Sequence, residues 1–485
     1  MLLNELLTSI EYLSYSGENN VEITGIAFDS REVKPGNLFV CIKGYESDGH
    51  KYAKSAVEKG ASAIVFENDV ECDIPKIKVA NSRKALSYLS ACFYDYPSKK
   101  MQIIGITGTN GKTTSTYLIK GILEACGYKV GLIGTNQNMI GDKVIETSKT
   151  TPDCLELNML LSDMVKEKVN FVVMEVSSHS LYLDRVAEID FKVGAISNVT
   201  QDHLDFHKTL EAYRDAKSIL FQKSEISVLN TDDSSYEYMK NKAKGKVISY
   251  GVGNGDVKAD DLFLNSNGIS YSVSFGEDSA RIFVGIPGKF NVYNSLLAIS
   301  VALSLGIPMP FIRMALKNQK GVKGRLEVLD TDTDYSVIID YAHTPDGLMN
   351  VIETINEFKK ARLITVFGCG GDRDNKKRSI MGEIATKNSD FTIITSDNPR
   401  TEDPMKIIDD ILKGAVGENY KVIENRKEAI SYALEIAKPE DIVLLAGKGH
   451  ETYQILNTGK IHFDEREVVA EILAVGELSE PASNP

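Results

Sequence analysis

The sequence predicts an α/β protein with three domains, which we place at residues 1–98, 99–322 and 323–485. Short strands rich in Val and Ile alternate with helical patterns of apolar residues through most of the chain. Polar loops follow many of these strands, as in sheets that bind ligands at the carboxyl ends of their strands. A chain of 485 residues is also too long for one hydrophobic core.

The composition excludes several classes of protein. A net charge of −13 and a pI near 5.2 argue against a broad basic surface for nucleic acid. We find no signal peptide at the start and no apolar stretch long enough to span a membrane, so we expect a cytoplasmic protein. The six cysteines form no C-x-x-C pair and predict neither a zinc site nor a disulfide framework.

The first domain is predicted to be a small α/β unit, with strands at 21–28, 37–42 and 61–66 and a helix at 52–59. A polar segment, residues 29–36, separates the first two strands and contains Ser30 and two cations. The pattern favours a solvated hairpin turn, and the alternative is an anchor for part of an anionic substrate. Residues 94–100 have the composition of a linker.

A glycine loop follows the strand predicted at residues 101–107 and precedes a helix at 116–125. The backbone N–H groups of such a loop bind phosphate, a lysine reaches the β- and γ-phosphates, and a threonine holds Mg²⁺. The match to G-x-x-x-x-G-K-[ST] is incomplete, because Ile106 stands where the first glycine would fall. The loop nevertheless predicts a nucleoside triphosphate site in a P-loop ATPase-like domain, formed by Gly108, Thr109, Asn110, Gly111, Lys112, Thr113 and Thr114.

The central domain is predicted to contain a largely parallel sheet, whose further strands are residues 129–134, 170–176, 192–198, 226–230 and 246–250. Glu175 closes one strand and can bind Mg²⁺ or cap the next helix. His203 and His207 have i, i+4 spacing, but the missing glutamate argues against zinc and favours a contribution to a Mg²⁺ site. Lys217 lies on a predicted helix at 210–221, where the pattern alone predicts a solvated side chain.

An antiparallel excursion is predicted within residues 230–283, and an apolar helix follows it at 295–305. Asn291 and Asn294 share one face before this helix, either as caps or as polar groups that reach a nucleotide.

The third domain is predicted to be a Rossmann-like α/β unit, with strands at 336–340, 363–367, 391–395 and 441–446. Polar loops follow all four strands, and we expect them on one edge of the sheet as a binding face. A dinucleotide site is not expected, because G-x-G-x-x-G is absent.

Several motifs together resemble the Mur ligases of peptidoglycan synthesis, and the resemblance extends over essentially the whole chain. The residues that carry it are the turn at Asp29-Ser30-Arg31, Gly108 to Thr114, Glu175 to His179, Asp202 to Asp205, Asn291 with Asn294, Gly324-Arg325, Asp340 to Pro345, and Gly447 to Glu451. The resemblance also accounts for the shifted glycine of the P-loop.

The loop Asp397-Asn398-Pro399-Arg400 resembles the signature of family members that add meso-diaminopimelate to UDP-N-acetylmuramoyl-L-alanyl-D-glutamate. Arg400 can make a bidentate contact to the carboxylate that diaminopimelate has and lysine lacks. Arg373 and Gly447 match other positions that hold this amino acid, and Glu451 can bind its distal ammonium.

The resemblance implies that ATP activates the D-glutamyl carboxylate as an acyl phosphate, which the amine of diaminopimelate then attacks. It assigns Thr113, Glu175, His203 and a carbamylated Lys217 to Mg²⁺. It assigns Asn291, Asn294, Arg325, Asp340 and His343 to ATP, and a part in catalysis to Lys112, Lys217, His203, Asn294, Arg325 and Asp340. The UDP-sugar dipeptide would be held by Ser30, Thr150, Thr151, Ser177 and Arg185, whereas Leu183 departs from a position that is often polar.

Three alternatives remain. Arg400 argues against an L-lysine-adding ligase, and the turn at residues 29–31 argues against a folylpolyglutamate synthetase. A P-loop ATPase switch that ligates nothing would leave the polar loops of the third domain unexplained. We expect a monomer that works in cell wall biogenesis, and hence in cell shape and division, without membrane insertion or a nucleic-acid partner.

Overall fold

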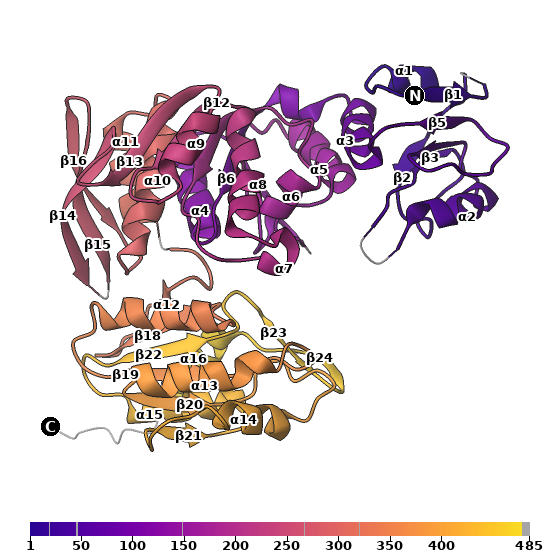
Figure 1. Ribbon diagram of the computed structural model, residues 1–485. Coiled ribbons are helices and arrows are strands. Elements are labelled where there is room, and N and C mark those ends of the chain that lie inside the picture. The colour runs from indigo at the N-terminus through magenta and orange to yellow at the C-terminus, as the bar shows by residue number, and fades with distance from the viewer. Residues whose placement is uncertain (19, 45–46, 148, 266, 320, 478–485) are drawn as a thin grey trace, which may run out of the picture. The chain divides into compact units, whose positions relative to one another are not determined.

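The structure is a computed structural model that describes residues 1–18, 20–44, 47–147, 149–265, 267–319 and 321–477. The chain divides into two compact units (Figure 1). The first unit comprises Met1–Lys258 and Leu296–Phe311, and the second comprises Ala259–Ser295 and Ile312–Pro485. Among the described residues, no helix has the length and apolar character needed to cross a membrane.

The first sheet of the first unit has the strand order β1-β5-β4-β3-β2. Its elements are α1 (Leu3–Leu7), β1 (Ser14–Ser16), β2 (Gly25–Ala27), β3 (Asn37–Val40), α2 (Ala53–Glu58), β4 (Ala63–Phe66), β5 (Lys76–Lys78) and α3 (Ser82–Phe93). β2 and β3 pair in parallel, so the hairpin turn expected at residues 29–36 is wrong. β3 is buried on both faces, with Leu38 and Val40 in one core cluster and Phe39 in another, as parallel strands commonly are.

The second sheet of this unit carries the P-loop. In the order β13-β12-β11-β6-β10-β7-β8-β9, the strands from β13 to β7 are parallel, as predicted, and β8 and β9 are antiparallel. The strands are β6 (Gln102–Thr107), β7 (Val130–Ile133), β8 (Asn138–Ile140), β9 (Lys143–Ile145), β10 (Phe171–Glu175), β11 (Phe191–Ile196), β12 (Ser224–Asn230) and β13 (Lys246–Val252). The helices are α4 (Lys112–Ala125), α5 (Cys154–Lys166), α6 (Ser178–Tyr182), α7 (Leu204–His207), α8 (Leu210–Gln222) and α9 (Tyr236–Lys242).

The antiparallel excursion is confirmed. It consists of β14 (Val257–Asn265), β15 (Gly268–Phe275) and β16 (Asp278–Val284), and β15 pairs antiparallel with β16. Ile269, Tyr271 and Val273 are buried at alternate positions, which gives the strand its period of two. The boundary between the units falls within β14, α10 (Phe290–Ser304) and α11 (Met309–Asn318).

The C-terminal sheet of the second unit has the order β17-β18-β22-β19-β20-β21, and only β17 is antiparallel. Its strands are β17 (Glu327–Val328), β18 (Ser336–Asp340), β19 (Leu363–Phe367), β20 (Phe391–Ile394), β21 (Tyr420–Val422) and β22 (Ile442–Ala446), and a separate hairpin joins β23 (Tyr453–Leu456) to β24 (Gly459–His462). The helices are α12 (Pro345–Asn356), α13 (Lys376–Asn388), α14 (Pro404–Leu412), α15 (Arg426–Ile436) and α16 (Glu465–Glu477).

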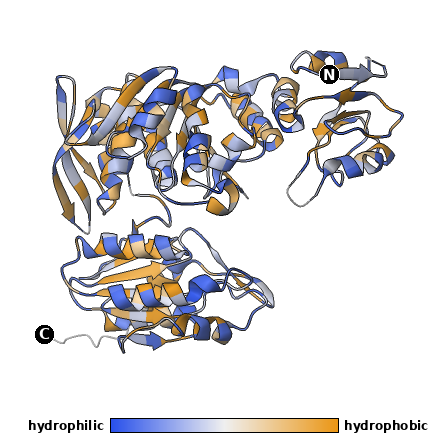
Figure 2. Ribbon diagram, viewed as in Figure 1, coloured by the Kyte–Doolittle hydropathy of each residue, from blue (hydrophilic) through white to orange (hydrophobic). Residues whose placement is uncertain are grey.

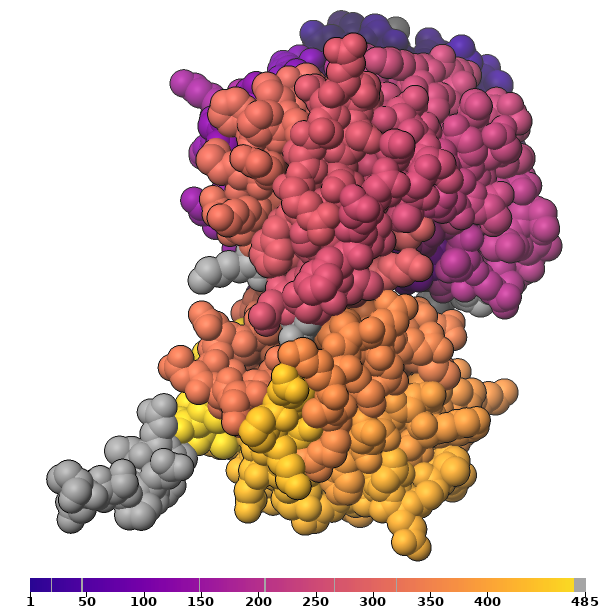
Figure 3. All heavy atoms as spheres, turned by 90° about the vertical axis from the view of Figure 1, so that its left-hand side faces the viewer, coloured from indigo at the N-terminus to yellow at the C-terminus, as the bar shows by residue number. Residues whose placement is uncertain are grey.

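The apolar residues of this sheet and its helices form its core. α15 and α16 pack their apolar residues against β18, β19, β20 and β22. Figure 2 shows the apolar strands between amphipathic helices, and in Figure 3 the orange and yellow segments form one rounded body. Because β18, β22, β19 and β20 are parallel, the four polar loops after them emerge at one edge, as predicted.

Candidate active site

The glycine loop closes tightly between β6 and α4. Gly108 has a φ of +139°, and a Cβ atom there would collide with the Ser197 hydroxyl, so the loop requires glycine at this position. Gly111, with a φ of +83°, precedes the first turn of α4. Lys112 folds back over the loop, where its Nζ donates to the carbonyls of Gly108 at 2.9 Å and Thr109 at 2.8 Å. The loop thus presents a helix N-terminus and an ammonium on one side, as phosphate binding requires.

Glu175 lies at the carboxyl end of β10 and is buried. Its Oε1 accepts hydrogen bonds from Thr113 Oγ1 at 2.9 Å and from the Thr135 amide at 3.0 Å, and its Oε2 accepts from Thr135 Oγ1 at 2.9 Å. The expected alternative, a cap of the next helix, is wrong, because Ser177 caps α6. The carboxylate is instead directed to the P-loop threonine.

Lys217 is buried within α8, contrary to the solvated side chain that the helical pattern predicted. Its Nζ donates to the Gly108 carbonyl at 2.9 Å and lies 4.4 Å from the centre of the Tyr213 ring. Burial, reinforced by the charge of Lys112, lowers the pKa of Lys217 well below its ordinary value, and Asp202 opposes this shift. The lowered pKa favours the neutral amine, which is the nucleophilic form that carbamylation by CO₂ requires.

The two histidines that share i, i+4 spacing lie in different surroundings. His203 has a left-handed backbone and a half-exposed side chain, and its ring lies 4.9 Å from that of His179. His207 is buried, and its Nε2 lies 3.0 Å from the Ser178 hydroxyl.

The oxygen atoms of Thr113 and Glu175 suit Mg²⁺, which binds few carboxylates and takes its other ligands from water and phosphate. Within the described residues, no group of three or more His, Cys, Asp or Glu side chains has an arrangement that could hold a metal by itself. The donor set therefore fits an ion that arrives with a nucleotide better than a permanently bound metal.

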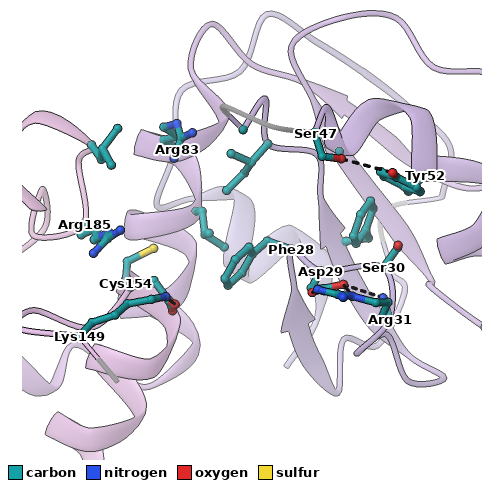
Figure 4. Close-up of a pocket in the computed structure, with 17 residues that line it drawn as sticks. Phe28, Asp29, Ser30, Arg31, Ser47, Tyr52, Arg83, Lys149, Cys154 and Arg185 are labelled. Carbon is teal, nitrogen blue, oxygen red and sulfur yellow. Dashed lines mark hydrogen bonds and ion pairs between the residues drawn. The ribbon is translucent and has the colours of Figure 1, made fainter. Parts of the chain in front are cut away.

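A cavity of about 540 Å³ lies within the first unit (Figure 4). Figure 4 shows Arg83, Lys149 and Arg185 on one side of it, and Ser30 and Arg31 on the other. The lining also contains Asp29, which pairs with Arg31, and Asp153, which pairs with Lys149. Four cations against two carboxylates leave a positive balance, which suits an anionic ligand such as a nucleoside diphosphate. The structure thus favours the substrate interpretation of the 29–31 turn over that of a merely solvated turn.

Only part of the predicted UDP-substrate set lines this cavity. Ser30 and Arg185 do, together with the apolar Leu183. The other three residues lie beside Glu175: Thr135 Oγ1 is 3.1 Å from Thr150 Oγ1, Thr151 Oγ1 donates to the Glu175 carbonyl at 2.9 Å, and the Ser177 amide donates to Thr151 Oγ1 at 3.1 Å. Arg185 connects the two groups, because its Nη1 donates to the Thr151 carbonyl at 3.0 Å.

In the second unit, the predicted nucleotide residues form two groups. Asn291 and Asn294 are buried and share one face, as predicted, with Asn294 Nδ2 donating to Asn291 Oδ1 at 2.8 Å. Asp340 accepts from the amides of Leu326 and Ala342, both at 2.8 Å. Burial raises the pKa of Asp340, and Arg325 opposes this shift.

Aromatic rings lie beside this second group. The Arg325 guanidinium is 5.2 Å from the centre of the Tyr341 ring. The centre of this ring is 4.5 Å from that of His343 and 4.8 Å from that of His450.

The three loops of the predicted amino-acid site are in direct contact. Asn398 Nδ2 donates to Glu451 Oε2 at 2.9 Å, and Arg400 Nη1 donates to the Gly371 carbonyl at 2.7 Å. Gly447 lies against Asp397, because a Cβ atom added to it would be 2.7 Å from Asp397 Oδ2. The remaining members are Pro399, which is buried, and Arg373, which is exposed.

Four polar residues at these sites were not among the predicted ones. Lys448 is fully buried, and its Nζ binds Glu451 Oε2 at 3.0 Å and Asn398 Oδ1 at 3.2 Å. Thr135 binds the Glu175 carboxylate, and Arg83 and Lys149 line the cavity. Lys448 could have been predicted, because it lies within the Gly447 to Glu451 loop that was expected to bind the amino acid. Arg83 could not, because its sequence pattern is that of any cation on a helix surface.

Three family models match the chain in succession. They are described as the Mur ligase family catalytic domain at residues 22–94, the Mur ligase middle domain at 106–302, and the Mur ligase glutamate ligase domain at 324–449.

Curated relatives match over almost the full length. Two proteins named UDP-N-acetylmuramoyl-L-alanyl-D-glutamate--2,6-diaminopimelate ligase are similar to this chain. The one from Clostridium botulinum is 54% identical, and the one from Clostridium acetobutylicum, numbered 1, is 50% identical. Each match covers 98% of this chain and 99% of the relative.

Solved structures agree with this similarity. A structure under the same enzyme name superposes with a TM-score of 0.74 at 31% identity, covering 98% of this chain and 99% of the other. A Mycobacterium tuberculosis folylpolyglutamate synthase reaches a TM-score of 0.61 at 16% identity, covering 76% and 92% of the two chains, and so shares the fold alone. On its sequence and its fold, this chain belongs to the Mur ligase family.

Proposed function

We propose that the protein is the ATP-dependent ligase that joins meso-diaminopimelate to UDP-N-acetylmuramoyl-L-alanyl-D-glutamate in peptidoglycan precursor synthesis. The observation that carries the proposal is the sequence of the loop Asp397 to Arg400. It is supported by the full-length similarity of the chain to diaminopimelate ligases. The structure joins this loop to Lys448 and Glu451 at one sheet edge. Arg400 offers a guanidinium to a carboxylate of the amino acid. Glu451, whose Oε2 also binds Lys448 and Asn398, is the carboxylate proposed for the distal ammonium.

The proposed reaction has two steps. The D-glutamyl carboxylate attacks the γ-phosphorus of ATP, which releases ADP and leaves an acyl phosphate. The amine of diaminopimelate then attacks the acyl carbon, and the tetrahedral intermediate expels phosphate as the amide forms. Such chemistry depends on positioning and on neutralising phosphoryl charge. Lys112 supplies that charge in the P-loop, and Asn291, Asn294, Arg325, Asp340 and His343 are proposed to hold the nucleotide.

We assign Mg²⁺ to Thr113, Glu175, His203 and carbamylated Lys217. When bound, the ion would neutralise phosphate charge. The contact between Thr113 and Glu175 supports the first two assignments, and burial of the Lys217 amine supports the last. Thr135 orients the Glu175 carboxylate by two hydrogen bonds.

The three proposed domains divide the substrates among them. Residues 1–98 would bind the uridine diphosphate together with Arg185 of the central domain. Residues 99–322 would bind ATP together with Arg325, Asp340 and His343, and residues 323–485 would bind the amino acid. The cavity with Ser30 and Arg185 supports a uridine diphosphate site, and Thr150, Thr151 and Ser177 would hold the peptide end beside Glu175. We further propose that the protein acts in the cytoplasm as a monomer.

Phosphate release from ATP tests the proposal. The purified protein is incubated with ATP, Mg²⁺ and UDP-N-acetylmuramoyl-L-alanyl-D-glutamate, and with meso-diaminopimelate, L-lysine or no amino acid. Release with diaminopimelate alone is the expected result. Equal release without an amino acid would refute ligation and favour the ATPase switch.

A further inference from the structure

A buried ion pair lies close to the two loops proposed to bind the amino acid, residues 397–400 and 447–451. It has no part in the chemistry proposed above. Arg426 is the first residue of α15 and Glu465 the first of α16, and their exposed fractions are 1% and 0%. Arg426 Nε and Nη2 each lie 2.8 Å from Glu465 Oε1. The pair thus joins the starts of two helices that cover the same face of the C-terminal sheet.

The other contacts of Arg426 are to two backbone carbonyls, one at the end of β22 and one just after β20. Its Nη2 donates to the carbonyl of Ala446 at 2.9 Å, and its Nη1 lies 3.5 Å from that of Ser396. Ala446 is the last residue of β22 and directly precedes Gly447, and Ser396 directly precedes Asp397. One guanidinium therefore contacts the chain at the starts of both loops.

These loops are packed closely enough for a small shift to matter. Gly447 leaves no room for a Cβ atom beside the Asp397 carboxylate, and Gln454 Nε2 donates to the Asp397 carbonyl at 2.6 Å. Lys448 and Glu451 then contact Asn398. A change in the spacing of the two strand ends would therefore displace the groups proposed to bind diaminopimelate.

Stability alone does not explain the pair. A buried ion pair is commonly no more stabilising than apolar residues of similar volume, because both charges lose their hydration. Glu465 Oε2 is also buried without a hydrogen-bond partner in the described part of the chain. The carboxylate is thus incompletely satisfied, which adds a desolvation cost to the pair.

We propose that Arg426, held by Glu465, is a positioning residue that sets the spacing of the 397–400 and 447–451 loops for binding the amino acid. This inference rests on the proposed function. It predicts a selective effect on diaminopimelate, because the contacts of Arg426 to Ser396 and Ala446 are at the strand ends that carry these two loops.

The test compares steady-state kinetics of the full-length wild type with the double variant Arg426→Met/Glu465→Leu, which leaves no unpaired buried charge. We expect the KM for diaminopimelate to rise about 10-fold or more and the melting temperature to change little. The 447–451 loop approaches the proposed nucleotide residues at His450, whose ring is 4.8 Å from that of Tyr341, but those residues lie outside both loops, so the KM for ATP should rise less. Arg426→Lys keeps the charge pair but lacks the planar fork, so it is expected to give an intermediate KM. This single variant also keeps the test decisive if the double variant does not fold.

The control is the ion pair of Arg362 and Asp441, which lies at the amino ends of β19 and β22 and in which the Arg362 side chain is 38% exposed. Arg362→Met/Asp441→Asn removes an ion pair from the opposite edge of the same sheet and should leave the KM for diaminopimelate unchanged. An unchanged KM in both Arg426 variants, or an equal rise in the control, would overturn the inference while leaving the proposed function intact. If the wild type itself does not ligate diaminopimelate, the proposed function fails, and the inference fails with it.

Discussion

Replacement of Arg400 by methionine should remove the preference for diaminopimelate over lysine. Arg400 Nη1 binds the carbonyls of Gly371 at 2.7 Å and Asn398 at 3.4 Å. Among the described residues, no hydrogen bond is made by its Nε or Nη2, which are therefore available to a ligand carboxylate. A bidentate pair supplies two charge-assisted hydrogen bonds, each about 1.5 to 3 kcal/mol.

The side chain is partly exposed, so we expect a combined loss of about 3 to 4 kcal/mol, near the lower end of the sum. Since about 1.4 kcal/mol corresponds to a factor of ten, kcat/KM for diaminopimelate should fall about 100- to 1,000-fold. Lysine lacks the second carboxylate, so its own low kcat/KM should change little.

The assay is phosphate release at varied concentrations of each amino acid, with the UDP-substrate saturating. Arg362→Met serves as the control, because it removes a guanidinium at the opposite edge of the same sheet. The ratio of kcat/KM for diaminopimelate to kcat/KM for lysine should fall in Arg400→Met. If it stays at its wild-type value, Arg400 does not select diaminopimelate.

Three further predictions follow from the local geometry. Gly108→Ala should raise the KM for ATP at least about 10-fold, because the new Cβ collides with Ser197, whereas Gly127→Ala, also at positive φ but in open space, should leave it unchanged in the same kinetic assay. Lys217→Met should lower kcat at least about 100-fold, because it removes the reactive amine. The melting temperature should not fall, because the substitution also removes the cost of burying that amine. A stable variant with normal kcat would contradict the role assigned to Lys217. Burial lowers the pKa of His450 to about 4, so between pH 6.5 and 4 the unfolded chain binds a proton that the folded chain does not. As the pH falls over this range, the free energy of unfolding of the wild type should decrease by about 1 to 3 kcal/mol more than that of His450→Gln, as measured by denaturant unfolding followed by circular dichroism. Parallel pH profiles of the two proteins would contradict this prediction.

The regular elements around the sites were predictable from local patterns. Continuous apolar strands predicted the parallel sheets, and parallel strands require their carboxyl ends to share an edge. The predicted strands therefore sufficed to predict that the four loops after β18, β19, β20 and β22 lie at one edge of the sheet. The glycine loop was predictable for a similar reason, because its residue types are those that a tight turn before a helix demands.

Features that depend on tertiary packing were not predictable. The polar sequence at 29–36 is compatible both with a hairpin turn and with a connection between parallel strands. Only the parallel pairing of β2 with β3 distinguishes these two structures. Lys217 has the spacing of a surface lysine, and its burial follows from contact with the P-loop more than a hundred residues away. Arg426 and Glu465 are separated by 39 positions in the sequence, and no local pattern indicates that they pair.

A competition experiment with a mass readout tests directly whether the protein is a diaminopimelate ligase. The enzyme is given ATP, Mg²⁺ and UDP-N-acetylmuramoyl-L-alanyl-D-glutamate with equal concentrations of meso-diaminopimelate and L-lysine, and the UDP-linked products are identified by mass spectrometry. We predict that the diaminopimelate adduct is the dominant product and that its formation requires ATP. A dominant lysine adduct would contradict the acceptor assignment, and ATP hydrolysis without any adduct would contradict the assignment as a ligase.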